Sequence, residues 1–366
     1  MDIQISEFIP NYENIELLHK LITTPNPTIT EEPLKVFISL VKKHKLEEVI
    51  TSWTKPLSHG FPSITHFMLN YSNVLKRITD PNDRNLFSRI DIVPFIVSKR
   101  PVKLEYPQHI PQYNLFHFGN ICHFNACINV LSSLTGLIIE LSQLKTQNKL
   151  TPEAQLIHQL LLNSLSCVDL NPSLSVKVLT TLNIHPSLID EADETMKKLL
   201  RPLYQSGLSL NTLFFWDSTD EFYKKTELKH TLSEKLHELK PVYFLCRIHD
   251  FNSVYDIDDQ QIHLESFNIT TDDQAVSCAY TLTSLVVFSP GHYVSAFDKC
   301  IIEGERFEDS GRRPVMIMND LNNRYQATMK PIASLFGSGL QHTIGCYVRD
   351  DVIYGDEQTA DNDAKQ

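Results

Sequence analysis

The sequence lacks the features that mark disulfide-rich, zinc-binding and membrane-spanning proteins. Its seven cysteines lie far apart and include no Cys-x-x-Cys pair. An odd number of scattered thiols suggests neither a disulfide framework nor a zinc site, so we expect reduced cysteines. No apolar run reaches the ~18 to 20 residues that a bilayer span needs. Because Asp2 and Glu7 replace the basic start of a secretion signal, we expect the cytoplasm or the nucleus as its compartment.

Positive charge is also scarce. The chain of 366 residues has 33 Lys and Arg against 44 Asp and Glu, a formal net charge of −11 with neutral histidines. Proteins that bind nucleic acid usually present clustered basic residues, so we expect no nucleic-acid partner. A composition of 42% hydrophobic and 21% charged residues is typical of a folded protein, and this length allows two or three domains.

The first third of the chain has the apolar spacing of helices. The residues that recur at helical intervals are Leu34, Phe37, Ile38 and Val41, then Leu46, Val49, Ile50 and Trp53. A stretch rich in Pro and Asp follows, from Thr79 to Pro111. We therefore predict a mostly helical N-terminal extension over residues 1–110.

Helical patterns precede strand patterns in the rest of the chain. Apolar residues from Phe124 to Leu141 predict one long amphipathic helix, and helical patterns continue to about residue 203. Four later segments are rich in β-branched and aromatic residues: Val242–Ile248, Thr281–Phe288, His292–Phe297 and Thr343–Val348. This segregation indicates an α+β fold. The acidic tail, residues 351–366, has little to bury and is predicted to be disordered.

Cys122 stands at the start of the predicted long helix. The free N–H groups and the positive dipole end of a helix start stabilise a thiolate, which is a nucleophile. The same position also suits a small buried hydrophobic residue, and position alone favours that interpretation.

His292 opens a predicted strand after the turn residues Ser289–Gly291. An imidazole there can face a cleft and deprotonate a thiol. Asn319 or Asp320 could accept a hydrogen bond from the imidazole and fix its orientation, although Asx pairs usually form turns.

Five segments in order resemble the motifs of the ubiquitin-specific protease family. Asn114–Leu131, NLFHFGNICHFNACINVL, resembles its cysteine box, GLxNxGNTCYxNAxLQxL. Ala279–Lys299, with Gly-His-Tyr between two strand patterns, resembles its histidine box, and Val315–Asp320, VMIMND, its third box. Asp190–Leu200, DEADETMKKLL, and Ser218–Phe222, STDEF, are similar to its QDAxEFxxxLL helix and its SxxxEF run.

The resemblance implies a papain-like fold over residues 111–350. A helical thumb, about 111–205, would carry the cysteine, and an antiparallel β palm, about 206–350, would carry the histidine. The short span between Cys122 and His292, without paired cysteines, predicts that the zinc-bound fingers of the family are reduced or absent, with no metal. It also suits a divergent member, such as one that a pathogen delivers into the host cell cytosol. The chemistry of the family requires no cofactor.

Roles carried over from the family make Cys122 the nucleophile and His292 its general base and later general acid. Asn319 would orient the imidazole, with Asp320 as the alternative. The implied reaction is a deubiquitination: cleavage of the isopeptide or peptide bond after the C-terminal glycine of ubiquitin, through a thioester.

Three further residues are implied to bind the tail of ubiquitin. Glu191 and Glu194 would hold its arginines, and Tyr293 would narrow the channel for its glycines. Two glutamates on a helix are, however, more often solvent-facing.

The sequence departs from the family at the oxyanion. The asparagine five residues before the cysteine is replaced by His117. Because loss of one oxyanion donor can cost ~10²-fold or more in rate, we expect His117 Nε2–H and the Cys122 amide to form the hole. If His117 only packs, the enzyme is slow or inactive.

Two alternatives stay open at this point. The chain is a protease for SUMO or another ubiquitin-like modifier, because loss of the fingers removes much of what selects ubiquitin. Alternatively, it is a catalytically weak or inactive module that binds ubiquitin.

Overall fold

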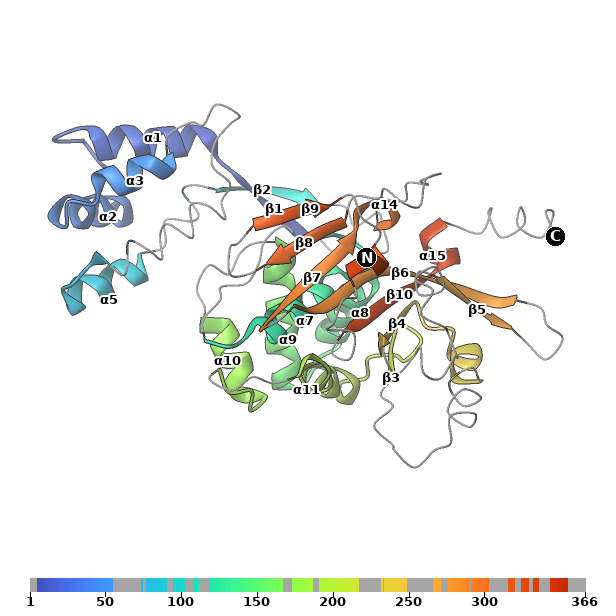
Figure 1. The fold of residues 1–366 in the computed structure, drawn as a ribbon. Helices are drawn as coiled ribbons and strands as arrows, with labels where there is room; N and C mark the ends of the chain where they lie inside the picture. The colour runs from blue at the N-terminus through green and yellow to red at the C-terminus, as the bar shows by residue number, and fades with distance from the viewer. Residues whose placement is uncertain are drawn as a thin grey trace. The chain divides into compact units, whose positions relative to one another are not determined.

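The chain forms two compact units in the computed structural model, one within Gln4–Val102 and one within Lys103–Gln366 (Figure 1). The structure describes residues 5–54, 74, 77–90, 95, 97–102, 108–111, 119–166, 173–186, 191–216, 232, 234–248, 266–270, 276–289, 291–302, 315–319, 324–328, 332–335 and 343–354.

The N-terminal unit combines helices with a small antiparallel sheet. Its elements are β1 (Ile5–Pro10), α1 (Tyr12–Thr23), α2 (Glu32–Lys43), α3 (Glu47–Thr54), α5 (Pro81–Arg89) and β2 (Val97–Val102). Asn11 caps α1 by accepting from the Asn14 amide at 3.2 Å, and Asp80 caps α5 by accepting from the Asn82 and Asp83 amides at 2.8 and 3.1 Å. The sequence predicted a mostly helical extension with helical spacing over α2 and α3, but it did not predict α1, α5 or the pairing of β1 with β2, which joins the two ends of the unit.

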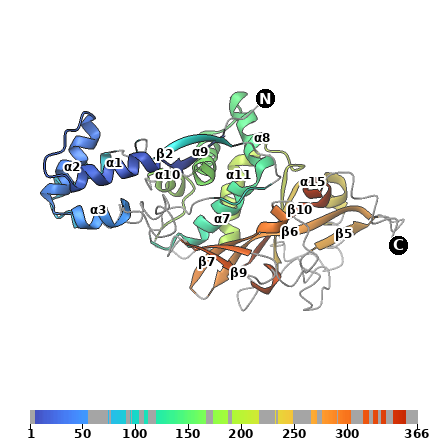
Figure 2. The same ribbon diagram turned by 90° about the horizontal axis from the view of Figure 1, so that it is seen from above.

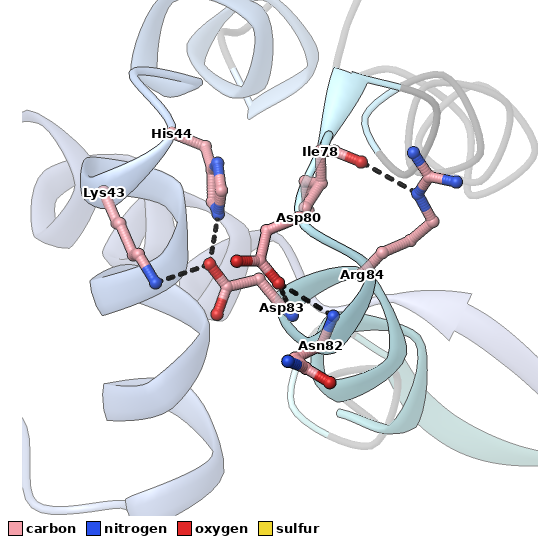
Figure 3. A network of polar contacts seen from close by, with 7 residues as sticks. All are labelled: Lys43, His44, Ile78, Asp80, Asn82, Asp83 and Arg84. Atoms are coloured by element: carbon pink, nitrogen blue, oxygen red, sulfur yellow. Dashed lines mark hydrogen bonds and ion pairs between the residues drawn. The ribbon is translucent and has the colours of Figure 1, made fainter.

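A polar cluster ties the end of α2 to the start of α5 (Figure 3). Asp83 Oδ2 accepts from Lys43 Nζ at 2.6 Å and from His44 Nε2 at 2.8 Å. Donation by Lys43, and then by His44, lowers the pKa of Asp83 below its ordinary 3.8. We call Lys43, His44 and Asp83 the Asp83 cluster. Both cationic side chains donate to the same carboxylate oxygen, so the evident role of the cluster is to join two helices.

The second unit has an α+β fold. Its described strands are β3 (Leu213–Trp216), β4 (Tyr243–Arg247), β5 (Ser266–Thr270), β6 (Val276–Ser289), β7 (His292–Asp298), β8 (Val315–Asn319), β9 (Arg324–Thr328) and β10 (Ile344–Arg349). They form an eight-stranded sheet in the order β3-β4-β10-β6-β7-β8-β9, with β5 paired to β6. The β3–β4 pair is parallel and the others are antiparallel.

Helices α7 (Cys122–Ser133), α8 (Thr135–Thr146), α9 (Pro152–Ser166), α10 (Ser173–Thr181) and α11 (Ala192–Gln205) precede the sheet in the chain. Both views place α7 against the sheet beside β7, with α9 and α11 packed against α7 (Figures 1 and 2). Ile128 and Leu131 of α7 are fully buried, which stabilises this packing by ~1.5–3 kcal/mol each. In the described part of the chain, none of the helices has the length and apolar character needed to cross a membrane.

The opposite face of the sheet has its own aromatic core. Phe244 lies at its centre, with its ring centroid 6.0 Å from those of Phe214 and Tyr347 and 6.3 Å from that of Tyr280. Such ring pairs add ~0.5–1.5 kcal/mol each beyond the area that they bury. The sheet is therefore held rigid from both sides.

The predicted long helix is in fact two helices, because Leu134 leaves the helical conformation with φ −81° and ψ 99°. The His109 amide donates to the Ser133 carbonyl at 2.8 Å, and Leu134 bridges to Gln108. The Tyr243 hydroxyl accepts from the Gly136 amide at 2.8 Å. This bond replaces the helical hydrogen bond that the Gly136 amide loses at the break. Tertiary hydrogen bonds thus end α7 where apolar periodicity alone would continue it.

The remaining described elements are α14 (Lys299–Ile302), the 3-10 helix η2 (Ile332–Leu335) and α15 (Asp350–Tyr354). The first residues of the tail that the sequence predicted to be disordered are therefore helical. The rest of this tail, residues 355–366, lies outside the described residues.

Candidate active site

Cys122 is the first residue of α7 and is held there by a tight approach of two loops. The Asn120 amide donates to the Pro186 carbonyl at 2.7 Å. Gly119 has a positive φ of 62°, and a Cβ at this position would lie 2.5 Å from the Pro186 oxygen. Only glycine combines this conformation with this contact. Ile121, the N-cap, offers no capping side chain, so the amides of the first turn remain for other acceptors.

His292 opens β7 directly after a hairpin turn. Ser289 and His292 are the last pair of the β6–β7 ladder, and Gly291 in the turn has a φ of 79°. The His292 side chain is half-buried, whereas that of Tyr293 is only 4% exposed. The turn therefore ends by presenting an imidazole at the rim of the sheet.

Helix α7 runs along β7 and brings Cys122 to His292. Asn129 Nδ2 donates to Ser295 Oγ at 3.2 Å, in the buried layer between helix and strand. From Cys122 to Asn129 a helix rises by ~10 Å, and from His292 to Ser295 a strand advances by ~10 Å. Cys122 and His292 therefore lie at similar distances from the Asn129–Ser295 contact. The sulfur and the imidazole come together at the N-terminal ends of α7 and β7.

The surroundings of the sulfur lower the pKa of the Cys122 thiol to about 6 from its ordinary 9.0. Burial is the largest influence and raises the pKa, but contacts with the sulfur outweigh it. The side chains of His123 and His292 and the backbone N–H of Tyr293 all favour the thiolate, and the charge of His292 acts in the same direction. At neutral pH the half-buried sulfur is therefore mostly an anion.

Cys127, on the same helix, shows how specific this environment is. Its side chain is fully buried and donates to the Ala192 carbonyl at 3.4 Å. Burial, and then the charge of Asp193, raise the pKa of Cys127 well above that of a free thiol. Of these two thiols, only Cys122 has the character of a nucleophile.

The predicted tail-binding residues differ in their surroundings. Glu191 and Glu194 are both exposed at the start of α11, and Glu194 pairs with Lys197 at 2.7 Å. Tyr293 is buried against this helix start, where burial is the main cause that raises the pKa of its phenol, and Glu191 adds to it. Glu191 therefore lies near the residue that follows His292.

Sequence reasoning missed Asp193, the acidic residue of this helix that is buried. Its carboxylate lies 3.3 Å from Arg247 Nη1 at the end of β4 and 3.9 Å from Lys197 Nζ. The sequence held one signal for it, the i,i+4 spacing of Asp193 and Lys197. Asp193 fixes the first turn of α11 to the sheet.

The remaining predicted residues are described only in part or not at all. The backbone of Asn319 ends β8, one position beyond the Ser295–Met318 pair and so at the half of β7 that begins with His292. His117 and Asp320 lie outside the described residues. The predictions for the oxyanion and for the alternative orienting residue therefore stay predictions.

No group of three or more His, Cys, Asp or Glu side chains within the described ranges could hold a metal ion. The predicted reduction of the fingers concerns residues such as 217–231 and 249–265, which fall outside those ranges. That prediction stays open too.

No protein-family model matches the chain, and none of the curated proteins matches it. Among solved structures, a chain of the SAGA Ubp8/Sgf11/Sus1/Sgf73 DUB module bound to monoubiquitin is similar with a TM-score of 0.41 and 10% identity, covering 87% of this chain and 97% of that one. A chain of the same module bound to ubiquitin aldehyde has a TM-score of 0.38 and 9% identity, covering 68% and 72%.

Proposed function

We propose that the chain is a cysteine deubiquitinase whose hydrolase domain lies within residues 111–350. The observation that carries the proposal is the contact between Cys122 and His292, which come from the start of a helix and the start of a distant strand. Their surroundings lower the pKa of the thiol to about 6. The order of the sequence motifs supports ubiquitin as the modifier and a thumb and palm arrangement as the fold.

The proposed reaction begins from the thiolate. Cys122 Sγ attacks the carbonyl carbon of the C-terminal glycine of ubiquitin, and the negative charge moves to the carbonyl oxygen. The uncapped start of α7 provides the Cys122 amide as one donor to this oxygen, and His117 is proposed as the other.

His292 then carries the proton through both halves of the reaction. It protonates the departing lysine amine as the tetrahedral intermediate collapses to the thioester. It next takes a proton from water, whose oxygen attacks the thioester carbon and releases Cys122 Sγ. Asn319, opposite the first half of β7, is proposed to hold the imidazole in place, with Asp320 as the alternative.

The acidic start of α11 is the proposed site for the basic tail of ubiquitin. Glu191 is the stronger candidate, because it is exposed and lies near Tyr293. Glu194 already pairs with Lys197, and a tail arginine would have to displace that lysine. Buried Tyr293 would form the floor of the channel rather than its lip.

The test is covalent labelling with electrophilic probes that carry ubiquitin or SUMO at the reactive end. Wild type should form an adduct with the ubiquitin probe, mapped to Cys122 by mass spectrometry, and Cys122→Ala should form none. Cys127→Ala is the matched control on the same helix and should label like wild type. Labelling by the SUMO probe alone would support the other modifier, and no adduct with either probe would overturn the proposal.

A further inference from the structure

A buried polar network joins α7 to the sheet and to a second helix. Asn129 of α7 donates through Nδ2 to Ser295 Oγ of β7 at 3.2 Å. Its side-chain oxygen accepts from Ser164 Oγ of α9 at 3.4 Å, and its backbone carbonyl accepts from Ser132 Oγ at 3.0 Å. The hydroxyls of Ser132 and Ser164 lie 3.2 Å apart. All four residues are at most 2% exposed, so the network belongs to the interior.

Ser295 lies where the three elements that carry the proposed reacting residues come together. Ser295 and Met318 form one end of the β7–β8 ladder, and Asn319 follows Met318 directly as the last residue of β8. From the other side, Asn129 brings α7, the helix that begins with the thiol, onto the same hydroxyl. A single buried contact therefore lies next to all three elements.

Apolar packing alone does not fix how far α7 is advanced along β7. The fully buried Ile128 and Leu131 hold the helix on the sheet, but hydrophobic contact has no direction, so a displaced helix could bury nearly as much surface. A hydrogen bond is directional, and a buried amide that loses its partner is unfavourable. Displacement of α7 by one turn would separate Asn129 from Ser295, so the network favours one alignment over the others.

The same network is expected to add little to stability. A hydrogen bond inside a protein replaces hydrogen bonds to water, so exchanging both partners for apolar groups of similar shape is close to neutral. Alignment therefore explains the network better than stabilisation does. Ser142 and His158 provide a comparison, because their contact of 3.0 Å joins α8 to α9 and does not involve β7.

We propose that Asn129 is a positioning residue whose amide, bonded to Ser295, holds the Cys122 sulfur opposite the His292 imidazole. It acts from ~10 Å along the helix and touches no reacting atom. This inference rests on the proposed function and deepens it, because it concerns the geometry of the same site.

The first experiment follows alkylation of Cys122 by iodoacetamide against pH in the full chain, with the modified peptide quantified by mass spectrometry. Wild type should have its midpoint at about pH 6. Asn129→Leu combined with Ser295→Ala removes both partners and should raise the midpoint by ~1 unit, because a displaced imidazole no longer stabilises the thiolate. Neither an amide nor a hydroxyl ionises in this range, so the shift would report a change of geometry.

Stability and turnover distinguish alignment from folding. The paired variant should keep the denaturant midpoint of wild type, whereas kcat for a fluorogenic ubiquitin conjugate should fall by ~10²-fold with KM unchanged. Ser142→Ala combined with His158→Phe is the matched control, because it removes a buried polar contact between helices outside β7. This control should leave both the alkylation midpoint and kcat unchanged.

Two results would overturn the inference. One is an alkylation midpoint of the paired variant equal to that of wild type, and the other is a shift that the control pair shares. If the paired variant fails to fold, Ser295→Ala alone replaces it in the test, and an unchanged midpoint in that variant would refute the role of the amide. Because alkylation involves no ubiquitin, this test can fail while ubiquitin probes still label Cys122, and the reverse also holds.

Discussion

The Asp83 cluster of the N-terminal unit and the Cys122 site of the second unit each place a histidine beside an ionisable partner. In the Asp83 cluster, one carboxylate accepts from both Lys43 and His44 and joins two helices. In the Cys122 site, a half-buried thiol with a lowered pKa lies beside His292. A carboxylate paired with two cationic side chains indicates a structural role, whereas an accessible thiol with a lowered pKa indicates a catalytic role.

The largest expected difference between the two regions is in turnover. His292→Ala removes the proposed base and acid and should lower hydrolysis of a fluorogenic ubiquitin conjugate by ~10²–10⁴-fold. His44→Ala removes an imidazole of similar exposure from the Asp83 cluster and should leave turnover unchanged. Equal losses in the two variants would contradict the division into chemical and structural histidines.

The pH dependence of the nucleophile should sharpen the same contrast. Because the pKa of Cys122 is lowered to about 6, the thiolate is present above that pH and is lost as the pH falls through it. Below about pH 6, alkylation of Cys122 should therefore drop ~10-fold per pH unit, and above it the rate should level off. In His292→Ala the midpoint should move towards the ordinary 9.0. A wild-type midpoint near that ordinary value would disprove the lowered pKa.

Backbone conformation at the two regions predicts opposite responses to substitution. Gly119→Ala should destabilise the loop before Cys122 by ~1–3 kcal/mol, because φ is positive and the new Cβ meets the Pro186 oxygen. Lys45, after the Asp83 cluster, has a φ of 53° at the end of α2, so Lys45→Gly should stabilise by up to ~1 kcal/mol. Denaturant unfolding measures both changes, and a shift of the same sign in the two variants would be inconsistent with them.

The smallest effect is expected from Asp83→Asn, because Lys43 is largely exposed and solvent screens the pair. The lowered pKa of Asp83 means that its contribution to stability is present above the unfolded pKa and is lost as the pH falls through the folded value, below 3.8. At neutral pH, amide hydrogen exchange in α2 and α5 should be slightly faster in the variant. At a pH below the folded value the difference should vanish, and a persistent difference would assign it to packing.

The sequence was most informative where motif and local structure coincide. Strand periodicity and turn residues predicted the strand that begins at His292, and apolar periodicity predicted a helix with Cys122 at its start. Apolar periodicity continues through Leu134, so it could not reveal a break whose causes are the Gln108 segment and the Tyr243 hydroxyl. These partners are distant in the chain and leave no local signal.

Acidic residues show the same limit at the start of α11. Motif spacing drew attention to Glu191 and Glu194, both of which are exposed. Burial instead selects Asp193, whose partner Arg247 belongs to a strand more than fifty residues later. The pairing of β1 with β2 was missed for a related reason, since it joins segments at opposite ends of the N-terminal unit.

The buried amide of Asn129 donates to Ser295 and so connects α7, which carries Cys122, to β7, which carries His292. It lies two helical turns from Cys122, in the buried layer between helix and strand. Substitutions in the surrounding surface loops should therefore leave the alignment of Cys122 and His292 unchanged, because that alignment is set in the interior.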